Sequence, residues 1–345
     1  MISKVQPEFV VIGAGGISKA YAQAFANGLP FRLVGVADIN LEAARTVADM
    51  VGARAFDDIE IMCAELQPTA AIVCTPPNTH APICIELMNL GMHVLCEKPL
   101  SITSHDARRM ISAAEHNGVT FTMGSKFRFV EDVQEARRII ESGRLGDVIL
   151  FENTFAGYVD MSNRWNSNPE ISGGGVLIDN GTHSIDIMRF LLGSVTELQV
   201  VEGRRIQNLD VEDTARLFVR NASGAMGSID LSWSMNKVQP HFISIYGSNG
   251  TLLVGWKESR YQLAGDSEWK VFGSGYDKVA AFSNQLKNFA GAISGEEELI
   301  IDATDALASV MAMETAYEAL RSSEWHQVQQ ADQAWVRPGV GAGVQ

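Results

Sequence analysis

Phe9-Val10-Val11-Ile12-Gly13-Ala14-Gly15-Gly16-Ile17-Ser18 is a short apolar run that passes through glycines into a segment with helical spacing. This order predicts a strand, a tight turn and a helix, the start of a dinucleotide-binding βαβ unit. Gly13 permits the turn, and Gly15 lets the backbone approach a pyrophosphate at the helix N-terminus. Ser18 replaces the usual third glycine and is small enough for close packing of helix on strand. We therefore expect cofactor contacts from Gly13, Gly15, Gly16, Ile17 and Ser18.

An acidic residue ends the next predicted strand, which runs from Phe31 to Asp38. Asp38 lies 20 residues beyond Ser18, the distance at which an acid can accept hydrogen bonds from the adenosine ribose hydroxyls. Its charge also repels a 2′-phosphate. The sequence therefore favours NAD over NADP.

Strand-like and helical segments alternate through the first third of the chain. We expect strands over residues 9–12, 31–38, 70–74, 93–96 and 119–123, and helices over residues 18–27, 41–51, 81–90 and 103–116. Strands that alternate with helices imply right-handed crossovers and a doubly wound parallel sheet. We assign residues 1–123 to this NAD-binding domain.

Residues 124–345 show a different pattern. Helices are expected over residues 131–141, 178–192, 277–293 and 303–320, and a strand over residues 148–156. Between residues 195 and 272, strand-like stretches follow one another across turns that contain Asn, Gly and Ser. Consecutive strands of this kind predict a mostly antiparallel sheet, so we expect an open-sheet α+β domain for substrate binding and oligomerisation.

Composition excludes several classes of protein. The 345 residues carry a formal net charge of −14, so nucleic acids and anionic membranes are poor partners. No run of 18 apolar residues appears, and Met1 to Pro7 lack the layout of a signal peptide. The four cysteines match no zinc or redox spacing, so we expect no metal site. A cytoplasmic protein with reduced thiols is the interpretation we prefer.

Several motifs beyond the glycine turn resemble the Gfo/Idh/MocA oxidoreductases, which are mainly sugar and polyol dehydrogenases. The likeness is carried by Thr75-Pro76-Pro77-Asn78-Thr79-His80, Glu97-Lys98-Pro99, Arg128-Phe129, and Gly173-Gly174-Gly175 followed by Asp179 and His183. The resemblance implies NAD-dependent hydride transfer at a sugar or polyol hydroxyl, with Lys98, Asp179 and His183 as catalytic residues. It also implies a cis Lys98–Pro99 peptide bond.

Two of these motifs follow apolar strands directly, and ligands of doubly wound sheets bind beyond the carboxyl ends of the strands. We therefore expect further cofactor contacts from Thr75, Pro76, Asn78, His80, Glu97 and Lys98. Lys98 lies in a loop constrained by proline, where its ammonium can stabilise a developing alkoxide by charge.

Asp179 and His183 are four residues apart near the start of a predicted helix, so they share one face. The glycines before them leave room for a ligand. The ordinary pKa of histidine suits His183 to take a hydroxyl proton near neutrality, with Asp179 positioning the substrate and the imidazole. Asp186, one turn later, either accepts from the second ring nitrogen of His183 or is a core or interface acid.

Lys98, Asp179 and His183 should also bind the substrate. Tyr158, Arg164 and Trp165 precede the glycines in a polar loop that the resemblance places near it. His241 is a further candidate for the pocket. The resemblance also implies a homodimer or homotetramer that packs through the second sheet, whose strands carry more apolar bulk than one face needs: Phe218, Ile229, Leu231, Trp233, Phe242, Ile243 and Ile245.

Two other functions remain open. A glycoside hydrolase that uses bound NAD in a transient oxidation would release a leaving group without net formation of NADH. A catalytically silent nucleotide-binding regulator would need none of the three catalytic residues. The sequence does not name the sugar, the carbon oxidised or the direction of the reaction, because pocket side chains rather than the fold decide these.

Overall fold

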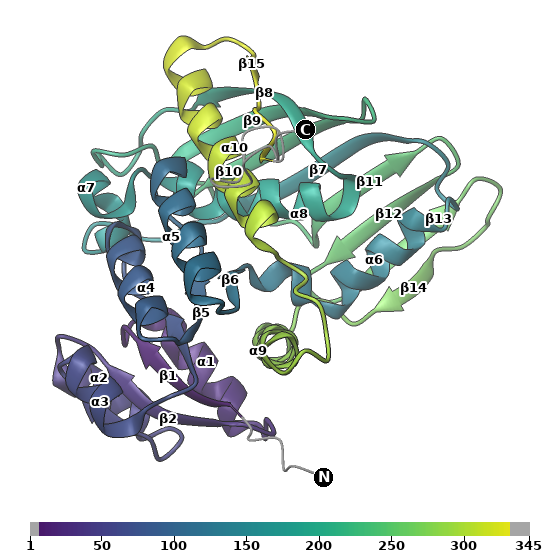
Figure 1. Cartoon of the computed structure of the whole chain (residues 1–345). Helices are drawn as coiled ribbons and strands as arrows, with labels where there is room; N and C mark the ends of the chain where they lie inside the picture. Colours follow the sequence, from purple (N-terminus) through teal and green to yellow (C-terminus); the bar gives the residue numbers. More distant parts are fainter. Residues whose placement is uncertain (1–6, 332–345) are drawn as a thin grey trace, which may run out of the picture.

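The computed structural model describes residues 7–331 and places two β-sheets in one molecule (Figure 1). The N-terminal residues before Pro7 and the Gly-rich tail from Pro338 to Gln345, which the sequence marks as loose, lie outside the described residues. The first sheet has six strands and the second has nine.

The first sheet is parallel throughout, with strand order β3-β2-β1-β4-β5-β6. Its strands are β1 (Glu8–Ile12), β2 (Arg32–Ala37), β3 (Arg54–Phe56), β4 (Ala70–Val73), β5 (His93–Glu97) and β6 (Phe121–Gly124). The helices between them are α1 (Gly16–Ala26), α2 (Leu41–Ala48), α3 (Ile59–Leu66), α4 (His80–Asn89) and α5 (Ser104–Asn117). The chain order reverses beside β1, which confirms the doubly wound sheet.

One strand of this sheet, β3, and one helix beside it, α3, were not expected from the sequence. Strand β3 has only three residues at the edge of the sheet, too few for an alternating pattern to stand out. Helix α3 carries apolar residues around most of its circumference, so its periodicity is weak. Asp58 caps it by accepting a hydrogen bond from the backbone N–H of Ile61.

The second sheet is mixed but mostly antiparallel, which confirms the predicted fold class; its order is β14-β13-β12-β11-β7-β10-β9-β8-β15. Within this second sheet, the described strands β10 and β7 pair in parallel, and the other described pairs are antiparallel. The strands are β7 (Val148–Ala156), β8 (Val195–Glu202), β9 (Thr214–Asn221), β10 (Met226–Ser232), β11 (His241–Gly247), β12 (Gly250–Gly255), β13 (Ser259–Leu263), β14 (Lys270–Gly273) and β15 (His326–Gln327).

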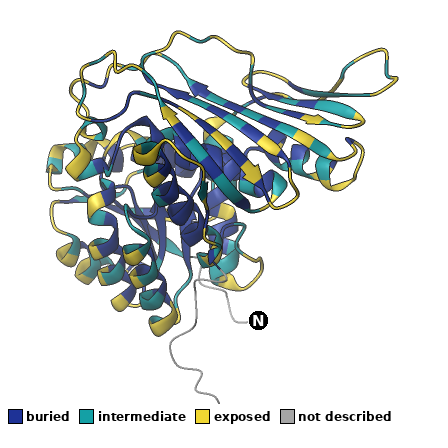
Figure 2. Cartoon of the chain, turned by 90° about the horizontal axis from the view of Figure 1, so that it is seen from above, coloured by how far each residue is buried: buried dark blue, intermediate teal, exposed yellow. Residues whose placement is uncertain are grey.

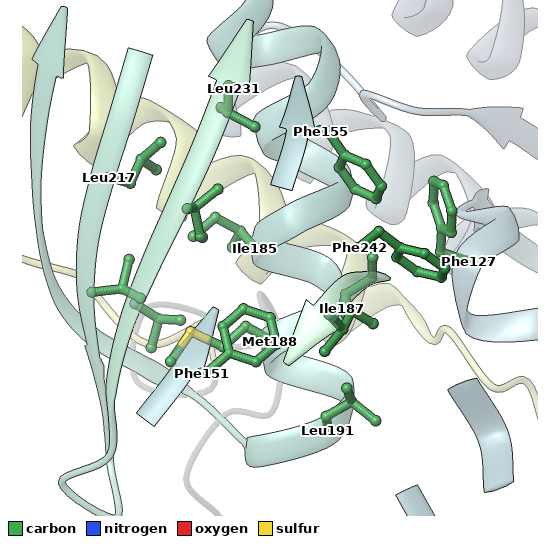
Figure 3. Packing of buried hydrophobic residues seen from close by; sticks show 14 of the residues in the cluster. Phe127, Phe151, Phe155, Ile185, Ile187, Met188, Leu191, Leu217, Leu231 and Phe242 are labelled. Atoms are coloured by element: carbon green, nitrogen blue, oxygen red, sulfur yellow. The ribbon is translucent and has the colours of Figure 1, made fainter. Parts of the chain in front are cut away.

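Buried and exposed residues alternate along the strands of the second sheet (Figure 2). The buried residues face α6 (Glu131–Glu141) and α8 (Thr182–Leu192). Ile185, Met188 and Leu191 of α8 belong to the same core as Phe151 and Leu217 of the strands, and Figure 3 shows Met188 next to Phe151. One expectation was wrong. Six of the seven residues proposed as surplus bulk are buried within this chain: Ile229, Leu231, Trp233, Phe242, Ile243 and Ile245. Only Phe218 is exposed, because strand register decides which face a residue occupies.

Two C-terminal helices pack back onto the first sheet. Phe282, Leu286 and Phe289 of α9 (Lys278–Ser294) share a core with residues of α1 and β1, and α10 (Ala303–Ser322) packs against α5. The two parts are thus joined by a shared core, and the domain boundary at residue 123 stays a prediction. This packing holds the carboxyl ends of the first sheet against the second sheet.

None of the helices between residues 7 and 331 combines the length and apolar character needed to cross a bilayer. A cytoplasmic location stays a prediction.

Candidate active site

The glycine turn between β1 and α1 has the shape that its sequence requires. Gly13 has φ +93°, and a Cβ there would lie 2.9 Å from backbone atoms of Cys74 and Thr75, so only glycine is accommodated. A Cβ added to Gly15 or Gly16 would meet no described atom within 4 Å, apart from the adjacent residues and the backbone of α1 itself. Open space at these two positions, at the positive end of α1, fits a pyrophosphate.

Ser18 and Asp38 each stabilise this turn with a hydrogen bond. The Ser18 hydroxyl is fully buried and donates to the carbonyl oxygen of Gly15 at 2.6 Å. The Asp38 carboxylate, just after β2, accepts from the backbone N–H groups of Ala14 at 2.6 Å and Asn40 at 2.8 Å. The structure therefore brings Asp38, the acid predicted to bind the adenosine ribose, beside the glycine turn. Ile17 lines the adjoining cavity.

A cavity of about 530 Å³ opens where β4, β5 and β6 end and the second sheet begins. Its volume lies within the range of small-molecule sites, about 300–1,000 Å³. The predicted residues that line it are Ile17, Thr75, Glu97, Lys98, Arg164, Trp165, Asp179 and His183. Residues separated by up to 166 positions are thus collected at one place, as the carboxyl-end rule predicts.

The loops after β4 and β5 are joined by His80, whose ring is buried. Its Nδ1 lies 2.9 Å from the carbonyl oxygen of Pro99, and its Nε2 lies 2.8 Å from that of Thr75. His80 therefore bridges the two loops and is not among the residues that line the cavity. Asn78 is exposed and Pro76 half-buried, both outside that lining. Cofactor contacts for these three residues stay predictions.

Glu97 ends β5, Lys98 follows it, and both residues line the cavity. The Glu97 carboxylate accepts from the Tyr21 hydroxyl at 2.7 Å and from the backbone N–H of Lys98 at 3.2 Å. Gln285 of α9 in turn donates to the Tyr21 hydroxyl oxygen. Burial raises the pKa of Glu97. The Lys98–Pro99 peptide bond is cis, as the resemblance implies.

Lys98 reaches across to the second part of the chain and pairs with Asp179. Its Nζ donates to Asp179 Oδ1 at 2.5 Å and to the Asp179 carbonyl oxygen at 3.1 Å. Asp179 lies in a π-helical turn, η4 (Leu177–Gly181), that leads into α8. Such turns often occur at functional sites because they re-aim side chains.

His183, on the first turn of α8, is buried against aromatic rings. The edge of its imidazole meets Phe127, with 5.0 Å between ring centroids, and Phe155 lies at 6.3 Å. Figure 3 shows Phe127 and Phe155 gathered with Phe242 at one end of the core. Burial lowers the pKa of His183 well below its ordinary value, and the charges of Lys126 and Lys98 lower it further. The imidazole is therefore neutral at pH 7.

The structure resolves the two roles left open for Asp186: it is a core acid. Arg128 binds it with two guanidinium nitrogens, at 3.0 and 2.6 Å, and Ser125 and Ser309 also donate to it. It makes no hydrogen bond to His183, whose Nδ1 is buried without a partner among the described residues. Arg128 and Asp186 thereby hold the end of β6 against α8.

Other residues of the chain, and not a ligand, fill the space beside the three glycines that precede Asp179. A Cβ on Gly174 would lie 1.8 Å from the Tyr317 hydroxyl, and one on Gly175 would lie 2.1 Å from the Glu212 carbonyl oxygen. The Glu212 carboxylate accepts from the N–H groups of Gly175 and Leu177 and from Tyr317. This clamp fixes the turn that carries Asp179. The expectation of free space for a ligand was wrong there, although Gly174 still lines the cavity.

The predicted substrate loop reaches the cavity only in part. Arg164 and Trp165 line its mouth and are exposed. Tyr158 is 60% exposed and is not among the lining residues, and the same holds for the half-buried His241. Substrate contacts for Tyr158 and His241 stay predictions.

Sequence reasoning missed Lys126, which begins the 3-10 turn η2 (Lys126–Phe129) directly after β6. It lines the cavity, and its Nζ lies 3.1 Å from His183 Nε2. Its place after a parallel strand was a usable signal. Trp233 and Trp256 also line the cavity and were missed, because they follow β10 and β12 of the second sheet, far from the motifs in sequence.

Comparisons with known proteins agree with this geometry. Residues 8–125 match the model of an oxidoreductase family with an NAD-binding Rossmann fold, and residues 133–253 match the GFO/IDH/MocA C-terminal domain. Inositol 2-dehydrogenase of Rhizobium meliloti (strain 1021) is 26% identical, covering 90% of this chain and 96% of that protein. Levoglucosan dehydrogenase of Pseudarthrobacter phenanthrenivorans is 25% identical, covering 72% and 73%.

A solved structure of levoglucosan dehydrogenase in complex with NADH and levoglucosan superposes with a TM-score of 0.86 at 22% identity. It covers 94% of this chain and all of that one. At this identity, the likeness describes the fold.

Proposed function

The chain belongs to the GFO/IDH/MocA family of NAD-binding oxidoreductases, and on that premise we propose that it is an NAD-dependent dehydrogenase of a sugar or polyol hydroxyl. The observation that carries the proposal is the convergence of Lys98, Asp179 and His183 on one cavity beside the glycine turn. The names of its relatives, inositol and levoglucosan dehydrogenases, support the substrate class.

The residues that would hold NAD are those of the glycine turn, Asp38 and the loops after β4 and β5. When bound, the nicotinamide supplies a hydride acceptor for oxidation and a hydride donor for ketone reduction.

The chain supplies the proton acceptor and the charge. In oxidation, the imidazole of His183 receives the hydroxyl proton, and its low pKa keeps it neutral and ready to accept. The Lys98 ammonium stabilises the negative charge that develops on the same oxygen. Asp179 holds that ammonium in place through its 2.5 Å contact. Phe127 packs against the buried His183 and shields its imidazole from bulk water.

A panel of sugars, inositols, sugar acids and sugar phosphates with NAD and NADP, followed by absorbance of the reduced cofactor, tests this function. Net NADH formation with at least one sugar or polyol is expected. Release of a leaving group without net NADH would instead identify the glycoside hydrolase, and binding without turnover of any substrate would identify the regulator.

NAD should be preferred over NADP. Asp38 offers the ribose an anion, and Ile39 beside it is 99% exposed and uncharged. Loss of a hydrogen bond to a charged group, about 1.5–3 kcal/mol, corresponds to roughly 10–100-fold in affinity. Asp38→Ser combined with Ile39→Arg is expected to weaken NAD binding by about that factor and to improve NADP binding, measured by protein fluorescence.

Ile39→Arg alone is the matched control for this switch, because it adds the cation while the carboxylate remains. It should leave NAD affinity nearly unchanged. Tighter binding of NADP than of NAD by the unmodified protein would contradict the role of Asp38.

The chain should assemble into a dimer or tetramer through the outer face of the nine-stranded sheet. Phe218, Met226 and Tyr246 are 37%, 52% and 36% exposed there, on strands that are close in the sheet order. Exposed apolar side chains grouped on one sheet face favour an interface. Light scattering at micromolar concentration should report an oligomer, and Phe218→Glu with Met226→Glu should raise the monomer fraction. A monomeric unmodified protein would refute the assembly.

A further inference from the structure

Lys126 is a charged residue inside the cavity to which the proposed mechanism gives no task. Its Nζ lies 3.1 Å from His183 Nε2 and 4.8 Å from the centre of the Phe127 ring. Lys98, the other ammonium in the cavity, is held by Asp179. Between residues 7 and 331, no carboxylate forms an ion pair with Lys126 within 4.0 Å. The polar contact that Lys126 does make is therefore with His183.

The direction of this hydrogen bond follows from the two groups. An ammonium has donors and no acceptor, so a charged Lys126 must donate and His183 Nε2 must accept. The ring hydrogen of His183 then lies on Nδ1, which is buried and has no partner among the described residues. In this state the lone pair of Nε2, which the substrate proton would need, is occupied by Lys126.

We propose that Lys126 and His183 act as a pair that holds one transferable proton, and that this pair, not His183 alone, takes the proton from the substrate hydroxyl. The inference rests on the proposed dehydrogenase function and deepens it. Oxidation requires the pair to begin without the extra proton, with Lys126 uncharged. Reduction of a ketone requires the pair to begin with the extra proton bound.

The charges around the pair favour a single proton. Lys98 and Glu97 face Lys126 from the end of β5, Asp179 from the turn η4, Lys278 from the start of α9, and His183 from α8. Burial and the charge of Lys98 lower the pKa of Lys126 to about 8, against the opposing charges of Glu97 and Asp179. A second proton on His183 would place two cations 3.1 Å apart away from bulk water. The proton that titrates near neutrality is therefore the first one that the Lys126–His183 pair binds.

The reaction balances with this pair. The O–H and C–H bonds of the alcohol break and its C=O bond forms. The hydride, with two electrons, goes to an oxidised nicotinamide dinucleotide as co-reactant. The proton comes to lie in the hydrogen bond between Nε2 and Nζ, two nitrogens that are 3.1 Å apart in the structure.

The pH dependence of kcat/KM for oxidation tests the pair, because two explanations predict opposite shifts. In the unmodified protein, the rate should fall about tenfold per pH unit below a pKa near 8. Lys126→Met leaves His183 as the sole base, so the fall should move down to below about 6.5, the ordinary value for histidine. In the alternative explanation, the charge of Lys126 only lowers the pKa of His183. The rate of the unmodified protein then falls at a pH well below 6.5, and in Lys126→Met this fall moves to higher pH. That result, or an unmoved profile, overturns the proposal.

A measurement without cofactor or substrate gives an independent readout. In the full chain, the imidazole signals of His183, assigned by their loss in His183→Ala, should change near pH 8 in the unmodified protein. In Lys126→Met, the change near pH 8 should disappear, and the His183 imidazole should become protonated at a pH below 6.5. Lys278→Met is the matched control, because this exposed lysine faces Lys126 from outside the cavity and should leave the change near pH 8.

These experiments distinguish a failure of the dehydrogenase mechanism from a failure of the Lys126–His183 pair. Normal turnover in His183→Ala would mean that the proposed mechanism itself fails. Loss of turnover in His183→Ala, with no movement of either pH profile in Lys126→Met, would mean that only the pair fails.

Discussion

Exchange of His183 for alanine is expected to lower turnover on the true substrate by about 10²–10⁴-fold, the usual effect of removing a general base. The imidazole is buried against Phe127, and its nitrogen faces Lys126 rather than a structural carbonyl group. Its task is therefore to handle a proton. Steady-state kinetics with saturating NAD measures the loss, and NAD affinity measured by fluorescence should change little.

The buried position of His183 calls for a control on folding. His93→Ala removes a half-buried histidine that does not line the cavity, so it should keep near-normal turnover. Thermal unfolding of both variants shows whether the fold is retained. If His183→Ala keeps near-normal turnover and an unchanged pH profile, another residue is the base.

Exchange of Lys98 for alanine or methionine should lower turnover by about 10²–10³-fold, the usual effect of losing one electrostatic donor to a developing oxyanion. The loss should appear in kcat, because the charge on the substrate oxygen grows only toward the transition state. Lys98→Met keeps most of the side-chain volume, so it tests charge rather than packing.

The same variant has an expected pH effect with a definite sign. Burial is the main cause of the lowered pKa values of His183 and Lys126, and the charge of Lys98 lowers both further. Its removal should therefore raise both values, and the acid-side fall in the oxidation rate should move to higher pH. A fall that moves to lower pH, or turnover within a few-fold of normal, would contradict the role of Lys98.

Lys98 and His183 act on one substrate oxygen, so their effects should not be independent. The double variant, Lys98→Ala with His183→Ala, should lose less than the product of the two single losses. A fully multiplicative loss would show that the two residues serve separate steps.

The local chemistry of the sequence determined the first sheet and much of the site. A glycine turn after an apolar strand predicts the βαβ start, because Gly13 has a backbone conformation that other residues rarely adopt. Asp38 and Thr75 lie just after strands and the Glu97–Pro99 motif begins at the end of one, and parallel strands present their carboxyl ends on one edge. Their convergence therefore follows from chain order. Cofactor contacts for His80, Asn78 and Pro76 stay predictions.

Contacts between distant segments were decided only in the tertiary structure. Tyr317 fills the space beside Gly174, Arg128 takes the carboxylate of Asp186, and Lys126 meets His183. Each of these pairs joins residues from different elements, and no local pattern states their distance. The faces of the second sheet were likewise decided by strand register, since a shift of one residue moves every side chain to the other face. The sequence therefore determined which residue types could act, and the packing of the two sheets determined which of them meet.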